Sequence, residues 1–158
     1  MAALKSDGTM WTWGRNADGQ LGIATTTKSD TPQQVKAADH KGFLKDVLAI
    51  APSWDHTIAL KKDGSVWAWE LSWNGLLGNA QTTEDSATPV QVKGVGGKGF
   101  FTDVAGIATA AGHNVAVKTD GTVFVWGSNN NDQLGLGPRG YPMMRSNPAQ
   151  MPGLNLNK

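Results

Sequence analysis

Three glycines in the stretch GVGGKGFF, residues 94–101, carry the spacing G-x-G-x-x-G, and Lys98 places an ammonium beside them. In nucleotide-binding proteins this spacing lets the backbone approach a pyrophosphate at the start of a helix. Here the stretch runs into FFTDVAGIA, residues 100–108, which has the composition of a strand. An internal copy, AADHKG at residues 37–42, keeps only the last glycine. We therefore predict a turn that leads into a strand and binds no cofactor.

Two histidines, His56 and His113, stand at the same place before similar apolar segments, HTIAL and HNVAV. A zinc site needs three or four converging ligands, and a general base needs a carboxylate that orients it. Asp55 precedes His56, but Gly112 precedes His113, so no histidine–carboxylate pair recurs. The pattern predicts histidines that hydrogen-bond to backbone inside a sheet. We expect no catalytic residues, no metal ligands and no enzymatic activity.

Composition excludes several classes of partner and site. The 158 residues include 14 basic and 13 acidic side chains, for a net charge of +1, which argues against nucleic acid or an anionic membrane surface as partner. The absence of cysteine excludes disulfides and thiolate zinc sites. No apolar run is long enough to span a bilayer, and the first residues lack the pattern of a signal peptide. The cellular compartment stays open.

The elements that carry these residues recur along the chain. Segments ALKSDGTMWTWGRNADGQLG, ALKKDGSVWAWELSWNGLLG and AVKTDGTVFVWGSNNNDQLG occupy residues 3–22, 59–78 and 116–135. Such copying is typical of propellers and solenoids. In each copy an Asp-Gly pair separates two alternating segments, which predicts a two-residue hairpin turn with positive φ at both residues. Both faces of the tryptophan-bearing segment are apolar, so the sheet should be covered on both sides.

Each complete unit holds four candidate strands, because an inner strand such as DVLAIA precedes the hairpin and an outer strand near TPVQV follows it. The sequence therefore predicts an all-β fold of four-stranded antiparallel propeller blades. We expect a partial blade over residues 1–35 and blades over residues 46–92 and 103–152. Two and a half to three blades do not close a ring, so we expect closure through a homo-oligomer or through further sequence.

The unit DVxxIAxxxxHxxALKxDGxVWxWGxNxxGQLG...TPxQV resembles the regulator of chromosome condensation repeat over nearly the whole chain. The resemblance implies a β-propeller that binds other proteins. Roles in that family include nucleotide exchange on a small GTPase, chromatin docking and, in bacteria, inhibition of β-lactamases. The stretch GVGGKGFFTDVAGIA is similar in style to prokaryotic members, and the chain shows no acidic loop or basic tail, so an exchange role is the least expected.

Loop residues without counterparts in the other repeats are the candidates for contact with a partner. Trp54 and Trp73 lie in turns where the other copies have alanine or asparagine. A longer loop, LGPRGYPMMRSNP, carries Arg139 and Tyr141. Trp, Tyr and Arg are enriched at binding hot spots. We predict these four residues as the partner-binding set, against the alternatives of packing on a neighbouring blade and of an ordinary surface loop.

These observations favour a protein–protein interaction scaffold that binds an unknown protein partner through loops on one face of the ring. One alternative is a structural propeller fragment that assembles only with itself. The other is an enzyme inhibitor of the bacterial β-lactamase-inhibitor type, with Trp54 and Trp73 at its contact surface.

Overall fold

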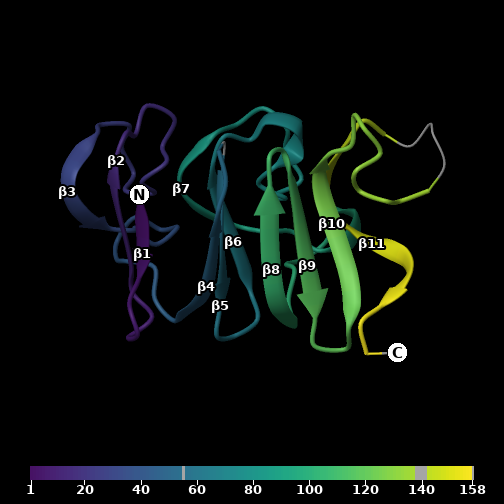
Figure 1. The fold of residues 1–158 in the computed structure, drawn as a ribbon. Helices are drawn as coiled ribbons and strands as arrows, with labels where there is room; N and C mark the ends of the chain where they lie inside the picture. Colours follow the sequence, from purple (N-terminus) through teal and green to yellow (C-terminus); the bar gives the residue numbers. More distant parts are fainter. Residues whose placement is uncertain (55, 138–141, 158) are drawn as a thin grey trace.

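The computed structural model describes residues 1–54, 56–137 and 142–157, which form three antiparallel sheets side by side (Figure 1). We call these sheets the first, second and third blade. The first blade contains β1 (Ala2–Leu4), β2 (Met10–Gly14) and β3 (Ser29–Gln34). The second contains β4 (Val47–Pro52), β5 (His56–Lys61), β6 (Val66–Glu70) and β7 (Ser86–Gln91). The third contains β8 (Val104–Ala110), β9 (His113–Lys118), β10 (Thr122–Ser128) and β11 (Met144–Asn155).

Strands are ordered sequentially within every blade, so each strand pairs with its neighbours along the chain. The inner strands β4 and β8 contact one another, and β1 contacts β4. In the part of the chain that the structure describes, β1 pairs only with β2, whereas β5 and β9 each pair on both sides. No helix among the described residues is both long and apolar enough to cross a membrane.

The tryptophan-bearing strand β6 is covered on both faces, as its alternating apolar pattern predicts. Val66 and Ala68 are fully buried on one face, and Trp69 is fully buried on the other. Trp69 packs with core residues of the first blade, and its Nε1 donates a hydrogen bond to the carbonyl oxygen of Gln20 at 3.1 Å. Trp126 repeats this contact one blade later, because its Nε1 donates to the carbonyl oxygen of Leu76 at 3.1 Å. Each indole therefore joins two adjacent blades by apolar contact and by a hydrogen bond.

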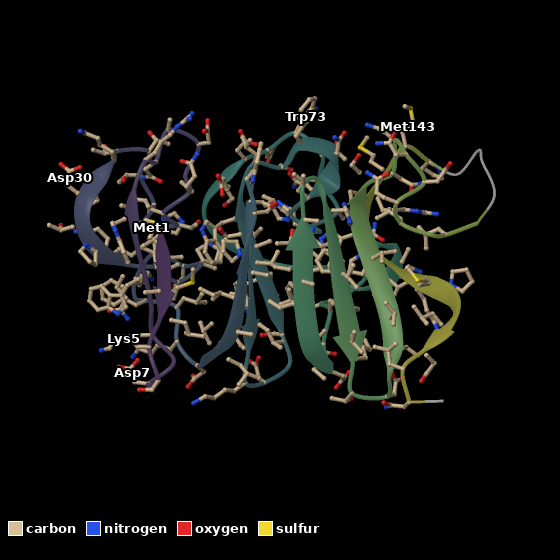
Figure 2. The ribbon with its side chains drawn as sticks, in the orientation of Figure 1. Met1, Lys5, Asp7, Asp30, Trp73 and Met143 are labelled. Carbon is tan, nitrogen blue, oxygen red and sulfur yellow. The ribbon has the colours of Figure 1, made fainter. Side chains whose placement is uncertain are left out.

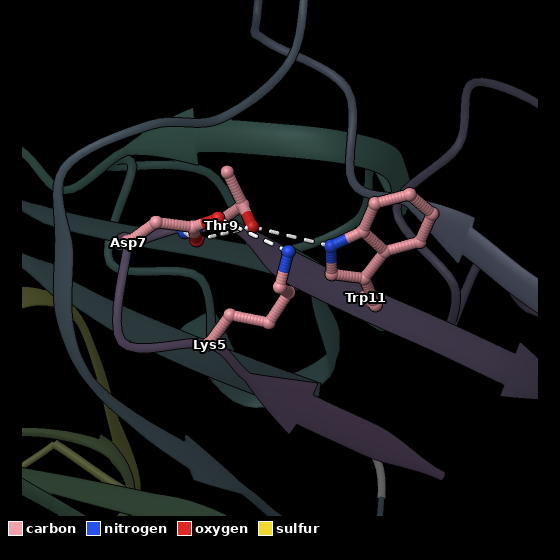
Figure 3. Close-up of polar contacts among 4 residues, drawn as sticks. All are labelled: Lys5, Asp7, Thr9 and Trp11. Atoms are coloured by element: carbon pink, nitrogen blue, oxygen red, sulfur yellow. Dashed lines mark hydrogen bonds and ion pairs between the residues drawn. The ribbon is translucent and has the colours of Figure 1, made fainter.

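An aspartate carboxylate organises the hairpin turn of each blade. Asp7 Oδ1 accepts hydrogen bonds from the Thr9 amide at 2.9 Å and from the Thr9 hydroxyl at 2.6 Å (Figure 3). The same hydroxyl accepts a hydrogen bond from Trp11 Nε1 at 3.2 Å, and Lys5 Nζ lies 3.1 Å from Asp7 Oδ2. The carboxylate bonds recur between Asp63 and Ser65 and between Asp120 and Thr122.

These turns differ from the predicted two-residue type. The Gly8 amide donates to the Lys5 carbonyl oxygen, and the Lys5 amide donates to the Thr9 carbonyl oxygen, both at 2.9 Å. Ser6, Asp7 and Gly8 therefore form a three-residue loop in which the glycine alone has a positive φ, of 79°. The prediction of positive φ at both residues was wrong, because the aspartate side chain closes a longer turn with glycine in the left-handed position.

We expect the stability of the fold to decrease as the pH falls from about 4 to about 2. Hydrogen bonds from the Thr9 hydroxyl and amide lower the pKa of Asp7 from 3.8 to about 2. Equivalent bonds lower the pKa of Asp63 and of Asp120. A carboxyl whose pKa is lower in the folded state stabilises that state above the unfolded pKa, and this contribution is lost as pH falls through the folded pKa.

Urea-induced unfolding measured across this pH range tests the expectation. A variant with Asp7, Asp63 and Asp120 all changed to Asn should show a flatter dependence of the unfolding midpoint on pH. If the wild type and the variant have the same slope between about pH 4 and about pH 2, these carboxylates do not carry the acid sensitivity.

Candidate partner-binding face

The long loops of the blades all leave from one end of the sheets, which we call the loop face (Figure 1). These loops follow β2, β6 and β10. Figure 2 places Trp73 and Met143 at this end and Lys5 and Asp7 at the opposite end. Trp54 also belongs to the loop face, because it lies in the β4–β5 connection and the first residue of β5, His56, pairs with Glu70 at the end of β6.

Trp54 is 90% exposed. It lines a hollow of about 540 Å³ that also has residues of the first blade in its wall, among them Arg15, and residues of the second blade, among them Thr57 and Glu70. The indole therefore lies where the first and second blades meet on the loop face. An exposed indole at such a junction offers a large rigid contact area to a partner.

Trp73 is 72% exposed and lies in η1 (Trp73–Gly75), a short 3₁₀ turn of the loop that joins β6 to β7. It lines a second hollow of about 390 Å³ with Leu71, Thr82, Thr83 and Asp85. All five residues come from this one loop of the second blade. The two tryptophans predicted from the sequence thus line separate hollows on the same face.

The turn that begins this loop is built differently from its counterparts. Asn16 organises the first-blade loop, because its Oδ1 accepts a hydrogen bond from the Leu21 amide at 2.8 Å, and Asn129 does the same for the Leu134 amide at 3.1 Å. Ser72 replaces this asparagine, and its amide donates instead to Asp85 Oδ1 at 2.8 Å. The loop that presents Trp73 thus has a carboxylate bond at this position, whereas the Asn129 amide of the third blade donates to the Met143 carbonyl oxygen at 2.7 Å.

Glu70 takes a position that is glycine in the other blades. Its φ of 93° resembles those of Gly14, at 110°, and Gly127, at 103°. Left-handed backbone is unfavourable for a residue with a β-carbon. Glu70 is nevertheless buried and lines the Trp54 hollow. The second repeat thus places a carboxylate-bearing side chain in a backbone conformation that favours glycine, beside an exposed tryptophan.

The remaining predicted contact residues, Arg139 and Tyr141, lie outside the described residues. Beside them in the sequence, Met143 is 70% exposed on the loop face (Figure 2). Met144 is 39% exposed and pairs with Ser128 at the end of β10. Asp85 and Leu71 were not predicted as site residues. Lys28 and Met144 occupy the positions equivalent to Asp85, because each immediately precedes the residue that takes the place of Ser86 in its strand ladder. A comparison of the repeats could therefore have found Asp85 as a carboxylate that the other two blades lack at this position.

His56 takes part in a buried network between the second and third blades. Its Nε2 lies 2.6 Å from Asn114 Oδ1 and 3.0 Å from Thr109 Oγ1. Asn114 Nδ2 donates to the Leu76 carbonyl oxygen at 2.9 Å, which also accepts the Trp126 bond. These contacts fix the packing of the blades and include side-chain partners that the sequence did not predict. Among the described residues no group of three His, Cys, Asp or Glu side chains is placed to hold a metal ion.

The glycine-rich stretch folds as the predicted turn. Val95–Gly97 form η2, a single 3₁₀ turn, and the Gly94 amide donates to the Gly99 carbonyl oxygen at 3.2 Å. Lys93 pairs with Phe100 in an isolated bridge, after which the chain enters β8. A phosphate cradle of this spacing leads into a helix, whereas this stretch leads into a strand.

Comparison with known proteins decides the family. A model of the regulator of chromosome condensation (RCC1) repeat matches residues 7–60, 63–117 and 120–158. The chain belongs to this family. Its sequence is 31% identical over 155 residues to the probable E3 ubiquitin-protein ligase HERC6 of Homo sapiens, covering 96% of this chain and 14% of that protein. It is 30% identical to the ultraviolet-B receptor UVR8 of Arabidopsis thaliana, covering 85% of this chain and 29% of that receptor.

Two solved structures share the fold. Human WBSCR16 superposes with a TM-score of 0.77 at 24% identity, over 94% of this chain and 34% of that one. Yeast RCC1 (Prp20), solved bound to Kap60, superposes with a TM-score of 0.74 at 22% identity, over 94% of this chain and 32% of that one. These likenesses confirm the predicted all-β fold of propeller blades, and closure of the blades into a ring stays a prediction. The two sequence relatives are eukaryotic, so a prokaryotic origin of the chain stays a prediction.

The RCC1-repeat chain spans less than a third of the length of each sequence relative named above, at 14% and 29%. The ligase activity in the name of HERC6 is that of a protein of which this chain matches only 14%.

Proposed function

We propose that this RCC1-repeat chain is a protein–protein interaction segment whose partner binds the loop face through Trp54 and Trp73. The observation that carries this proposal is the 90% and 72% exposure of the two indoles on the same face of a single blade. Truncation of a tryptophan at a binding hot spot costs on the order of 2–4 kcal/mol of binding free energy. Neither tryptophan has a counterpart in the other repeats, so the fold itself does not require them.

The class of partner is supported by the names of similar structures. Prp20p of Saccharomyces cerevisiae is described with binding properties to Gsp1p and histones, and yeast RCC1 (Prp20) is bound to Kap60 in its structure. Those partners are proteins, which is consistent with a protein partner for this chain. Inhibition of an enzyme would be one form of the same kind of contact.

Capture of partners by immobilised protein tests this proposal. We expect a Trp54→Ala, Trp73→Ala double variant to retain less than about a tenth of the partner that the wild type retains, since two hot-spot side chains are lost. The matched control is a Phe43→Ala, Phe100→Ala double variant. Both phenylalanines are exposed, at 41% and 53%, and they follow the ends of β3 and β7 that point away from the loop face. A partner lost with the control but kept by the tryptophan variant would contradict the proposal.

Assembly between copies of the chain is a second candidate, favoured by the pairing of the first blade. Among the described residues β1 has a partner on one side only, while the equivalent strands β5 and β9 are each paired with an inner strand as well. An edge of unpaired amides and carbonyls is a template for another strand. Light scattering after size-exclusion chromatography tests this candidate: one defined multiple of the chain mass supports it, and the mass of one chain contradicts it.

A further inference from the structure

The loop that joins β6 to β7 in the second blade combines an exposed indole with acidic residues and no basic ones. Residues 63–92 contain no lysine or arginine, although the chain as a whole has 14 basic side chains. Glu84 and Asp85 lie at the end of the loop that carries Trp73, and both are exposed. The loop that carries Trp73 therefore has a net negative charge from its own residues, which favours a partner with positive charge.

Asp85 is held at a fixed place in the wall of the Trp73 hollow. Its Oδ1 accepts a hydrogen bond from the Ser72 amide at 2.8 Å. Leu71, which precedes Ser72 in the sequence, lines the same hollow. A carboxylate has about four acceptor sites on its two oxygens, so this bond leaves acceptor capacity for a ligand. The hollow of about 390 Å³ therefore offers an indole, an aliphatic wall and an oriented carboxylate.

The other blades show that the fold does not need this combination. In the strand ladders Ser29 and Arg145 are equivalent to Ser86, so the residues equivalent to Asp85 are Lys28 in the first blade and Met144 in the third. The counterparts of Trp73 in the tryptophan-bearing repeats are Ala17 and Asn130. The first blade thus has the opposite charge where the second has Asp85, and neither other blade has an aromatic residue where the second has Trp73.

We propose that the Trp73 hollow binds an arginine side chain in an exposed basic segment of a protein partner. The guanidinium stacks on the indole face of Trp73 and pairs with the carboxylate of Asp85, while its aliphatic stem lies against Leu71. Arginine suits this site better than lysine, because its planar group stacks on aromatic rings and matches a carboxylate in two-point contact. This inference rests on the proposed function, since it names the partner chemistry of the same face.

Fluorescence anisotropy with a labelled peptide of alternating arginine and glycine tests the inference. We expect binding that weakens about tenfold in Trp73→Ala, from loss of the cation–π contact, and about threefold in Asp85→Asn. Asparagine keeps an oxygen that can accept the Ser72 amide, so the second variant removes the charge without removing the loop bond. We also expect binding to weaken as salt is raised.

Two control variants match these changes outside the hollow. Asp39 is exposed and accepts the Lys41 amide at 3.0 Å, so Asp39→Asn removes a carboxylate with a similar local bond. Phe100→Ala removes an exposed aromatic ring that does not line the hollow. We expect both to bind the arginine peptide as the wild type does.

The inference is overturned if the arginine peptide does not bind, if a glutamate–glycine peptide binds equally well, or if the control variants weaken binding as much as the hollow variants do. Two outcomes separate this inference from the proposed function. If partner capture depends on Trp54 and Trp73 but the arginine peptide does not bind, the proposed function stands and only the basic partner is rejected. If partner capture does not depend on the two tryptophans and the peptide does not bind either, the proposed function is rejected as well.

Discussion

Trp126→Ala is expected to lower the free energy of unfolding by about 3–5 kcal/mol, the range for removing a fully buried aromatic side chain. The indole is buried between the second and third blades, where it makes edge contact with Phe101 at a centroid distance of 6.1 Å. The substitution leaves a cavity and also removes the 3.1 Å hydrogen bond to the Leu76 carbonyl oxygen. Urea-induced unfolding monitored by circular dichroism measures the change in free energy.

Trp73→Ala is the matched control for this change, because it truncates the same type of side chain at a 72% exposed position. We expect it to change the free energy of unfolding by no more than about 0.5 kcal/mol. Equal effects of the two substitutions would mean that the indole of Trp126 does not hold the blades together. The same control shows whether binding losses in Trp73→Ala arise from contact rather than from unfolding.

Gly75→Ala is expected to cost about 3 kcal/mol of stability, from overpacking together with left-handed backbone strain. A β-carbon at Gly75 would lie 2.5 Å from Ser146 Cα and 2.8 Å from the Arg145 carbonyl oxygen. These atoms belong to the backbone of β11 in the third blade, so they cannot move aside by a side-chain rotation. The φ of Gly75 is 74°, which adds strain for any residue with a β-carbon.

Gly96→Ala separates the two causes. Gly96 has a similar φ of 68°, but a β-carbon there would have no heavy atom within 4 Å. Alanine at this position should therefore cost only the backbone strain, about 1–2 kcal/mol. If thermal or urea unfolding gives the same loss for both variants, the backbone of β11 accommodates the added β-carbon and overpacking contributes nothing to the cost of Gly75→Ala.

Local sequence signals were sufficient for most of the fold. The repeat period, the Asp-Gly pairs and the alternation of apolar residues in β6 all depend on residues close together in the chain. They predicted propeller blades and the family, and the structure and comparisons confirm both. The turn type was predicted wrongly, because the pattern of Asp7 and Gly8 does not show that the carboxylate bonds to Thr9.

The candidate site was found from the sequence in part, because the repeats provide an internal comparison. Trp54 and Trp73 stood out as residues with no tryptophan counterpart, and both are exposed on the loop face. Asp85 was overlooked, although the comparison with Lys28 was available. Its place in the hollow depends on a bond to Ser72, thirteen residues earlier, that no periodic pattern encodes.

The sequence by itself determined the strands, the places of the turns and the repeat to which this chain belongs, since those follow from short-range preferences that each unit satisfies alone. Only the tertiary structure decided which polar atoms meet between blades. Trp69 reaches the Gln20 carbonyl oxygen across 49 residues, and His56 reaches Asn114 across 58. Periodicity sets the spacing of the blades, but the partner of each buried donor is set by the side-to-side packing that brings neighbouring repeats together.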